Sequence, residues 1–377
     1  MRRFALLLLG CLLLVAGASA DPADPWWDDN WEKRVPLTVT DASATDGIQG
    51  LYNVTYDSDM QSNFDDLRFV QDDGSTAIPY WIESQVDGSY ARAWVKLPGS
   101  DTLAYMYYGN SAAESESDGD AVFVFFDDFN AGSLNTSKWT IVGGYASPTF
   151  ADGEMRVGNN CYVTGDVSFG ADYAAVLRFK VDSAYTNTGY GFGFGGENYA
   201  SVSQGHLYTS GATNNGAVTA YRTTYDRREI IRNGAVNVIH KTNGAQDRTG
   251  VYKSSAAVPV RFLSWASGRY SAIDWLFVRT YTATEPTLSP GTEEAGTTSL
   301  SPFPGISLSP QDLNGDGLYT DINGNGRLDY NDLTIFFQNI AWAKTNQPTE
   351  AFDFNGNGWL DYNDVITLFT TITGEHP

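Results

Sequence analysis

The chain has 377 residues, a formal net charge of −22 and 14% aromatic residues. This length is too great for one compact core, and the aromatic content indicates globular structure and not disorder. The acidic balance argues against nucleic acid as a partner, because phosphate binding needs clustered Lys and Arg, and it suits calcium.

Residues 1–20 have the pattern of an export signal. Basic MRR precedes the apolar run FALLLLGCLLLVAG, and the small residues ASA close the segment. Two variants remain open, because LLGC resembles a lipoprotein box at Cys11 and Arg2-Arg3 suits the twin-Arg route. The rest of the sequence has no apolar run of transmembrane length, so the mature chain is expected to be secreted or attached to the cell surface. Its single remaining cysteine, Cys161, is expected to be a small buried residue.

Residues 26–121 alternate between the two faces of expected strands. In ARAWVKLPG, Ala91, Ala93 and Val95 fall on one face and Trp94 on the other, and QDDGST supplies an Asp-Gly hairpin turn. We therefore expect a small antiparallel β-sandwich. PWWDDNWEKRVPLTV, ARAWVKLPG, LAYMYYGN and DGDAVFVFFDDF resemble, in order, the motifs of an uncharacterised domain family of secreted and cell-surface proteins in archaea and bacteria. That resemblance implies no activity.

Residues 122–285 are expected to form a second β-sandwich. FFDDFNAGSLNTSKWTIVGG opens it and SAIDWLFVRTYTATEP closes it, and both ends resemble those of concanavalin-like or laminin-G-like jelly rolls. The strand GYGFGFGGENY places Tyr190, Phe192 and Phe194 on one face and glycines on the other. A glycine face allows close approach, either by a stacked sugar ring or by a second sheet packed on an aromatic core.

Residues 286–310 are dominated by Ser, Thr, Pro and Gly, which predicts a semi-extended linker. Residues 311–377 are expected to be a small α-helical calcium module. The predicted fold is therefore mainly β and multidomain, with two antiparallel β-sandwiches before that module.

Two copies of one motif define the calcium module: DINGNGRLDYND over residues 321–332 and DFNGNGWLDYND over residues 353–364. Calcium binds about six to eight oxygen atoms, which an EF-hand loop supplies from positions 1, 3, 5, 7, 9 and 12, with Gly at position 6 for a sharp turn. Solvated Asx-rich turns would explain the Asp and Asn residues but not the repeated glycine and register. The predicted ligands, with backbone carbonyls at position 7, are Asp321, Asn323, Asn325, Arg327, Asp329 and Asp332 in the first loop and Asp353, Asn355, Asn357, Trp359, Asp361 and Asp364 in the second.

The upstream segment DLNGDGLYTDIN begins another loop in the same register. Asp312, Asn314 and Asp316 would take positions 1, 3 and 5, and Asp321 is a further candidate ligand of this partly shared third site. The alternative is an acidic lead-in that only caps the fold. Two calcium sites are therefore predicted, and a third stays open.

Apolar periodicity predicts a helix after each loop, with Phe336 and Phe337 on the buried face of the first, whereas Pro348 prevents a full helix before the second loop. A loop followed by an exit helix, twice, resembles a type I dockerin over about residues 311–374. The resemblance implies docking to a cohesin-type protein module, and the near-identity of the two copies suggests docking in either of two orientations. Loop positions 10 and 11, which help to choose the partner in dockerins, depart here from the small hydroxyl residues of the best-known members: they are Tyr330, Asn331, Tyr362 and Asn363.

The favoured function is that of an exported, non-catalytic multimodular protein that binds a polysaccharide or surface glycan and docks through its calcium module. No catalytic residue is assigned. Exposed aromatic rings would bind sugars by stacking, although core or edge packing is the favoured interpretation for each candidate ring taken alone. The tryptophan candidates are Trp26, Trp27, Trp31, Trp81 and Trp94.

Two other functions remain open, a glycoside hydrolase in polysaccharide breakdown and a structural cell-envelope adhesin. Hydrolysis usually needs two carboxylates about 5 to 10 Å apart. In the second sandwich the best same-strand pair is Asp152 and Glu154, which flank a glycine and more simply indicate a turn.

Overall fold

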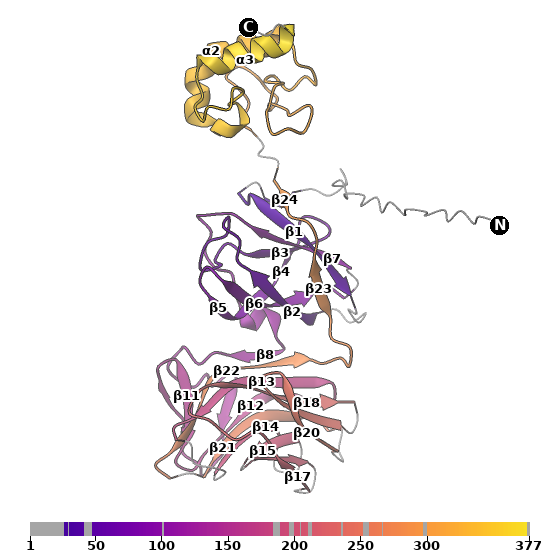
Figure 1. Ribbon diagram of the computed structural model, residues 1–377. Helices are drawn as coiled ribbons and strands as arrows, with labels where there is room; N and C mark the ends of the chain where they lie inside the picture. Colours follow the sequence, from indigo (N-terminus) through magenta and orange to yellow (C-terminus); the bar gives the residue numbers. More distant parts are fainter. Residues whose placement is uncertain are drawn as a thin grey trace, which may run out of the picture. The chain divides into compact units, whose positions relative to one another are not determined.

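The computed structural model describes residues 26–374, except positions 29, 41–46, 100–101, 184–188, 196–199, 204, 210–212, 235–236, 252–255, 266 and 297–299. The predicted export signal lies outside the described residues. The chain forms two compact units, of which the first ends at Ala295 and the second begins at Gly296. The first unit holds two antiparallel β-sandwiches and the second is helical, which confirms the predicted fold class (Figure 1).

The first sandwich packs a six-stranded sheet on a three-stranded sheet, around a core that includes Leu37, Phe69 and Val95. The six-stranded sheet has the order β23-β1-β7-β3-β4, with β24 also paired to β1. Its strands are β1 (Lys33–Thr40), β3 (Arg68–Gln71), β4 (Ala77–Ile78), β7 (Leu103–Tyr108), β23 (Thr287–Pro290) and β24 (Glu294–Ala295). The smaller sheet has the order β2-β6-β5, with β2 (Ile48–Thr55), β5 (Tyr80–Val86) and β6 (Tyr90–Leu97).

Strands β23 and β24 belong to the first sandwich although they follow the second sandwich in the chain. Leu37 of β1 lies opposite Pro290, Lys33 lies opposite Ala295, and Leu288 enters the core. In Figure 1 the orange β23 lies along the first sandwich. The predicted linker over residues 286–310 is therefore wrong in its first part, because these residues complete a sheet whose other strands lie far away in the sequence.

The helix α1 (Gly119–Val122) leads into the second sandwich, a jelly roll of an eight-stranded and a seven-stranded sheet. The eight-stranded sheet has the order β10-β11-β22-β13-β18-β19-β20, with β8 also paired to β22: β8 (Phe125–Asp127), β10 (Thr149–Ala151), β11 (Glu154–Gly158), β13 (Tyr173–Val181), β18 (Asp226–Asn233), β19 (Asn237–Thr242), β20 (Ala245–Val251) and β22 (Tyr270–Thr280). The seven-stranded sheet has the order β17-β16-β15-β14-β21-β12-β9: β9 (Trp139–Ile141), β12 (Cys161–Phe169), β14 (Tyr190–Phe194), β15 (Ala200–Ser203), β16 (His206–Thr209), β17 (Thr213–Ala217) and β21 (Val258–Ser264). Cys161 lies in the core between the sheets, where burial raises the pKa of its thiol to about 11.

The two sandwiches share a buried aromatic junction. Trp81 and Trp94 of the first sandwich contact aromatic rings of the second, and the rings of Phe123 and Phe277 stack with centroids 3.9 Å apart. Trp31, Trp81 and Trp94 are all buried. Packing therefore accounts for these three rings, as favoured for each ring taken alone, and sugar stacking does not.

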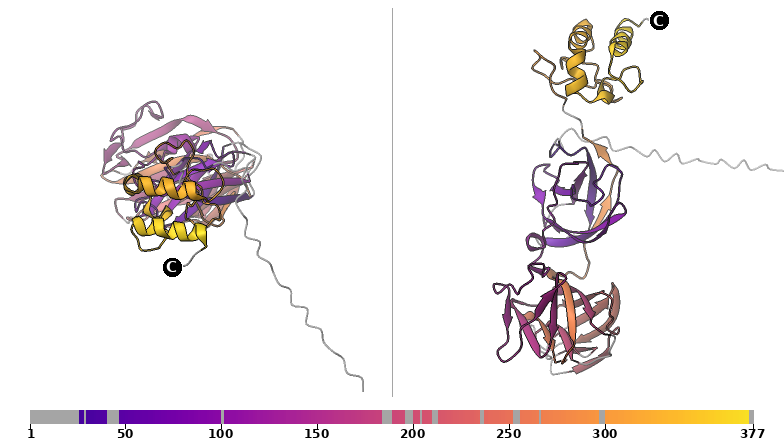
Figure 2. Two further views of the ribbon diagram at one scale, coloured as in Figure 1. Left: turned by 90° about the horizontal axis from the view of Figure 1, so that it is seen from above. Right: turned by 90° about the vertical axis from the view of Figure 1, so that its left-hand side faces the viewer.

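The second unit contains α2 (Tyr330–Asn346), the short 3₁₀ helix η1 (Thr349–Ala351) and α3 (Tyr362–Thr373). Helices α2 and α3 lie side by side, as both views in Figure 2 show. Between α2 and the second loop there is only η1, directly after Pro348. This confirms that no full helix leads into the second loop. Among the described residues, no helix is long and apolar enough to cross a bilayer.

Candidate calcium loops and binding surfaces

The two predicted calcium loops fold alike. In the first, the Asp321 carboxylate accepts the backbone N–H of Gly326 at 2.6 Å, and in the second the Asp353 carboxylate accepts that of Gly358 at 2.6 Å. Both glycines have φ near +80°, a left-handed conformation that favours glycine. The glycine at position 6 therefore turns each loop around the carboxylate at position 1.

The carboxylate at position 12 closes each loop onto its exit helix. Asp332 accepts the N–H of Asp329 at 2.8 Å and that of Asn323 at 3.1 Å. Asp364 accepts the equivalent N–H groups at positions 9 and 3, at 2.8 Å and 3.2 Å. Asp329 and Asp361 in turn form capping boxes at the N-termini of α2 and α3. Each loop thus holds the side chain at position 12 against positions 3 and 9 while it starts a helix.

The oxygen atoms in these loops suit a cation. Asp321, Asp332 and Asp364 are fully buried, and within the described residues no Lys or Arg forms an ion pair with them. Burial, with the charges of Asp321 and Asp329, raises the pKa of Asp332, and burial also raises that of Asp364. Bound calcium would offset this repulsion. In the described part of the chain His, Cys, Asp and Glu alone form no metal cluster of three, so the fit depends on the Asn side chains and backbone oxygens as well.

The upstream segment reproduces only part of this geometry. Asp312 accepts the N–H of Gly317 at 2.8 Å, and Asp316 accepts that of Leu318 at 2.9 Å, as positions 1 and 5 do in the full loops. Its position 12 would be Asn323, whose N–H is already bonded to Asp332 in the first full loop. A third calcium site there stays a prediction.

The predicted partner-binding residues lie on an exposed apolar surface. Leu333, Thr334 and Phe337 of α2 and Val365, Ile366 and Phe369 of α3 line a groove of about 360 Å³, which we call the α2–α3 face. Tyr330 and Tyr362 are each 58% exposed at its ends. Phe337 is 55% exposed, so its predicted burial with Phe336 is wrong.

The α2–α3 face is nearly symmetric. The ring of Tyr330 contacts Phe369, with centroids 6.5 Å apart, and the ring of Phe337 contacts Tyr362 at 5.7 Å. Each tyrosine is the first residue of its helix, and a phenylalanine follows it seven residues later in the same helix. Each tyrosine contacts the phenylalanine of the other helix. These reciprocal contacts are consistent with the pseudo-twofold arrangement that the near-identity of the loops predicts.

A hollow of about 640 Å³ lies where the first sandwich meets the jelly roll. Most of its charged residues are paired with one another. Glu83 lies 3.0 Å from Arg227, and Arg178 lies 2.5 Å from Asp274. Asp128 also lines the hollow, and within the described residues it forms no ion pair.

Asp152 and Glu154, the same-strand carboxylates of the jelly roll, do not form a hydrolytic pair. Asp152 and Gly153 have φ of 57° and 73° and make the turn between β10 and β11, as their sequence predicts. Glu154 is buried and ion-paired with Lys180 and Arg156, and those contacts hold its pKa below the usual range despite its burial. A general acid in a glycosidase needs the opposite shift.

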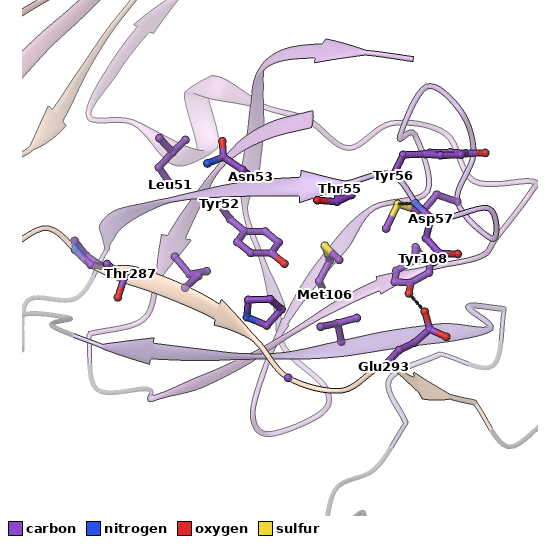
Figure 3. Close-up of a pocket in the computed structure, with 16 residues that line it drawn as sticks. Leu51, Tyr52, Asn53, Thr55, Tyr56, Asp57, Met106, Tyr108, Thr287 and Glu293 are labelled. Atoms are coloured by element: carbon purple, nitrogen blue, oxygen red, sulfur yellow. Dashed lines mark hydrogen bonds between the residues drawn. The ribbon is translucent and has the colours of Figure 1, made fainter. Parts of the chain in front are cut away.

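A second hollow, of about 650 Å³, opens between the edge strands β2 and β23 of the first sandwich. Figure 3 shows Tyr52 and Met106 lying between these strands and the hydroxyl of Tyr108 bonded to Glu293. Lys33 lies 3.3 Å from Glu293. The returning strand β23 therefore forms one wall, which sequence patterns could not have revealed.

The glycine strand β14 has its aromatic rings inside. Phe192 and Phe194 belong to the jelly-roll core, so Gly191 and Gly193 lie on the outer face of the seven-stranded sheet. Packing therefore accounts for the rings, while on the glycine face Gly191 is half-buried and Gly193 is buried. Trp265, which directly follows β21 of the same sheet, is 40% exposed. A single Trp after a strand carries no periodic signal, so the sequence did not predict its exposure.

Comparison with known proteins gives a domain family and a set of similar folds. Residues 63–142 match a domain of unknown function (DUF2341), which supports the resemblance of the first sandwich to an uncharacterised family. No curated protein matches the chain. The family match does not reach the second unit, whose dockerin-like character stays a proposal.

Among solved structures, the chain is similar to an endo-β-1,3-glucanase from Pyrococcus furiosus, at 9% identity and a TM-score of 0.35 over 43% of this chain and 95% of that one. It is also similar to a lichenase from a mouse hindgut metagenome, at 9% identity and 0.33 over 41% and 98%. The carbohydrate recognition domain of Emp47p matches at 11% and 0.32 over 41% and 94%. At these identities and TM-scores the likenesses carry no functional conclusion.

Proposed function

We propose that this protein is an exported carrier of binding modules. Its jelly roll and first sandwich hold a polysaccharide or surface glycan, and its second unit docks onto a cohesin-type module. The observation that carries the proposal is the repeated loop-helix unit, whose two helices expose one symmetric apolar surface. Exposed apolar patches of this kind mark protein interaction sites.

Calcium is proposed to hold the second unit together. The ligands would be the Asp and Asn side chains and the carbonyls of Arg327 and Trp359, as the loop register predicts. The bound ion would neutralise buried carboxylates and so fix the start of each helix. Calorimetric titration of the mature chain with calcium tests this directly, because it measures the number of ions bound per chain. Two bound ions would support the two full loops alone, and three would include the Asp312 segment.

The docking function is tested by capture on immobilised cohesin-type modules with calcium or chelator present. Calcium-dependent capture supports it. Equal capture in chelator, or no capture by any module of the panel, counts against it.

The glycan-binding function is tested separately. The mature chain is mixed with insoluble polysaccharides in calcium, and both retention and released sugars are measured. Retention without product supports the proposal, and released sugars would favour a hydrolase. Absence of retention on every polymer would shift the interpretation to a structural adhesin.

A further inference from the structure

Strand β21 places an arginine on the outer face of the seven-stranded sheet. Val260 and Phe262 belong to the core, so Arg261 between them points the other way. In the register of the sheet Arg261 lies opposite Thr164 of β12 and Gly193 of β14. The first sandwich covers the other sheet of the jelly roll, not this one.

Arg261 is buried without a counter-charge. It is only 7% exposed, donates one hydrogen bond of 3.0 Å to the hydroxyl of Tyr162, and lies 5.4 Å from the centre of that ring. Within the part of the chain that the structure describes, no carboxylate forms an ion pair with it. Arg228, also buried, pairs with Asp226 at 2.9 Å, and Arg232 donates to backbone carbonyls. A largely buried cation without a counter-charge is poorly stabilised, so an anionic ligand would stabilise Arg261 by supplying the charge.

The remaining donors of Arg261 are open to such a ligand. The Nε atom of Arg228 is buried without a hydrogen-bond partner, whereas within the described part of the chain no nitrogen of Arg261 is both buried and unbonded. Its guanidinium therefore keeps unused N–H groups that solvent can reach. A planar guanidinium matches the geometry of carboxylate and sulfate groups.

The surroundings of Arg261 suit a sugar ring. Gly193 and Gly191 carry no side chain on the face of β14 beside Arg261, where Gly191 is half-buried and Gly193 is buried. Trp265, 40% exposed, directly follows β21. Its backbone N–H donates to the carbonyl oxygen of Gly189 at 2.7 Å, so the pairing of β21 with the chain before β14 continues to this residue. Alternation along the strand then places the Trp265 side chain on the same face as Arg261. An indole beside a flat glycine surface provides a stacking platform.

We propose that this face binds an anionic saccharide. Arg261 donates hydrogen bonds to a carboxylate or sulfate group of the sugar, and Trp265 and Tyr162 contact its rings. The inference rests on the proposed glycan binding and names the class of glycan. Because the chain carries a net charge of −22, its overall field repels polyanions, and retention of one requires a local cation such as Arg261.

The test compares the binding of the full mature chain to hyaluronate, dextran sulfate and uncharged dextran, at fixed calcium and ionic strength. Arg261→Gln should weaken binding of the charged polymers by at least about tenfold, because one charge-assisted contact is lost. Arg178→Gln is the matched control, since it removes the same charge from an exposed side chain on the other sheet. Trp265→Ala should weaken binding to every polymer that is retained. Thermal melts check folding, and Tyr162→Phe, which removes only the hydroxyl bonded to Arg261, is the fallback if Arg261→Gln does not fold.

The outcomes separate this inference from the function on which it rests. Equal losses in Arg261→Gln and Arg178→Gln indicate general electrostatics and overturn the inference. If dextran and the charged polymers bind equally and Arg261→Gln changes nothing, the anionic-saccharide inference is overturned but glycan binding stands. If no polymer is retained, both the inference and the proposed glycan binding fail. The polymer that responds to Arg261→Gln identifies the group as carboxylate or sulfate. If sodium sulfate competes as well as the polymer at equal charge, the site recognises an anion without a saccharide, and the proposal fails.

Discussion

Trp81 of the first sandwich and Trp275 of the jelly roll contact each other edge to face, with ring centroids 5.5 Å apart. The same cluster includes Trp94, Phe123 and Phe277, all buried. An interface built from stacked aromatic rings resembles a core more than a flexible hinge. The two sandwiches are therefore expected to behave as one folding unit.

Trp81→Ala should destabilise both sandwiches together. Removal of a buried Trp side chain leaves a cavity and costs about 3–5 kcal/mol in the free energy of unfolding. Denaturant unfolding followed by tryptophan fluorescence and by limited proteolysis of each sandwich measures the effect. Trp359→Ala, at a position that is 73% exposed, is the matched control and should change stability by less than about 0.5 kcal/mol. Separate transitions of the two sandwiches, with only one of them shifted, would contradict this prediction.

Removal of calcium should unfold the second unit without unfolding the first. Chelator is expected to lower the helical circular dichroism that comes from α2 and α3. Asp332→Asn and Asp364→Asn should each weaken calcium binding by about tenfold or more, because each removes a charge at position 12. Asp72→Asn, at an exposed position of the first sandwich, is the control for loss of one carboxylate. Equal helicity with and without chelator would refute the prediction.

Docking should tolerate damage to one half of the α2–α3 face and fail when both halves are damaged. Phe337→Ala alone or Phe369→Ala alone should lower affinity for a cohesin-type module only about twofold, because the second orientation remains available. The double variant should lose at least about a hundredfold, measured by calorimetry. Leu308→Ala, an exposed apolar position outside the face, serves as control. A full loss from either single change would show that only one orientation is used.

The jelly roll should lose stability as the pH falls below 6.5. His240 is fully buried, and burial lowers the pKa of its imidazole from the ordinary 6.5, although Asp247 at 3.0 Å opposes that shift. The folded state therefore binds fewer protons than the unfolded state below this pH, and the free energy of unfolding declines by up to about 1.4 kcal/mol per pH unit. His240→Gln cannot titrate and should show a flatter decline in chemical denaturation at pH 7.5 and 5.5. Parallel declines in both proteins would rule out His240 as the cause.

Local patterns predicted the parts of the fold that depend on near neighbours. Alternation placed Tyr190, Phe192 and Phe194 on one side of a strand, and the structure shows that side to be the core. Helical periodicity and Pro348 predicted two exit helices without a full entering helix before the second loop. Each of these features is set by residues within one element.

Long-range contacts account for what local patterns left open or predicted wrongly. Trp81 and Trp94 lie on strands in which polar and apolar residues alternate, a pattern that leaves one face exposed. Both side chains are buried because they contact the jelly roll. The segment around Leu288 is rich in Thr and Pro, yet it pairs with β1 from the start of the chain. Arg261 and Trp265 carried no signal either, since their significance depends on the glycines of a neighbouring strand.

The return of the chain through β23 and β24 also has a mechanical meaning. If the second unit is held by a partner, tension enters the first unit at Ala295 and acts first on the pairing of β24 and β23 with β1. The jelly roll, inserted between β7 and β23, lies beyond this point on the load path. If the jelly roll holds a glycan as proposed, a pull between the two anchors passes through the backbone hydrogen bonds of the small sandwich before it reaches the jelly roll.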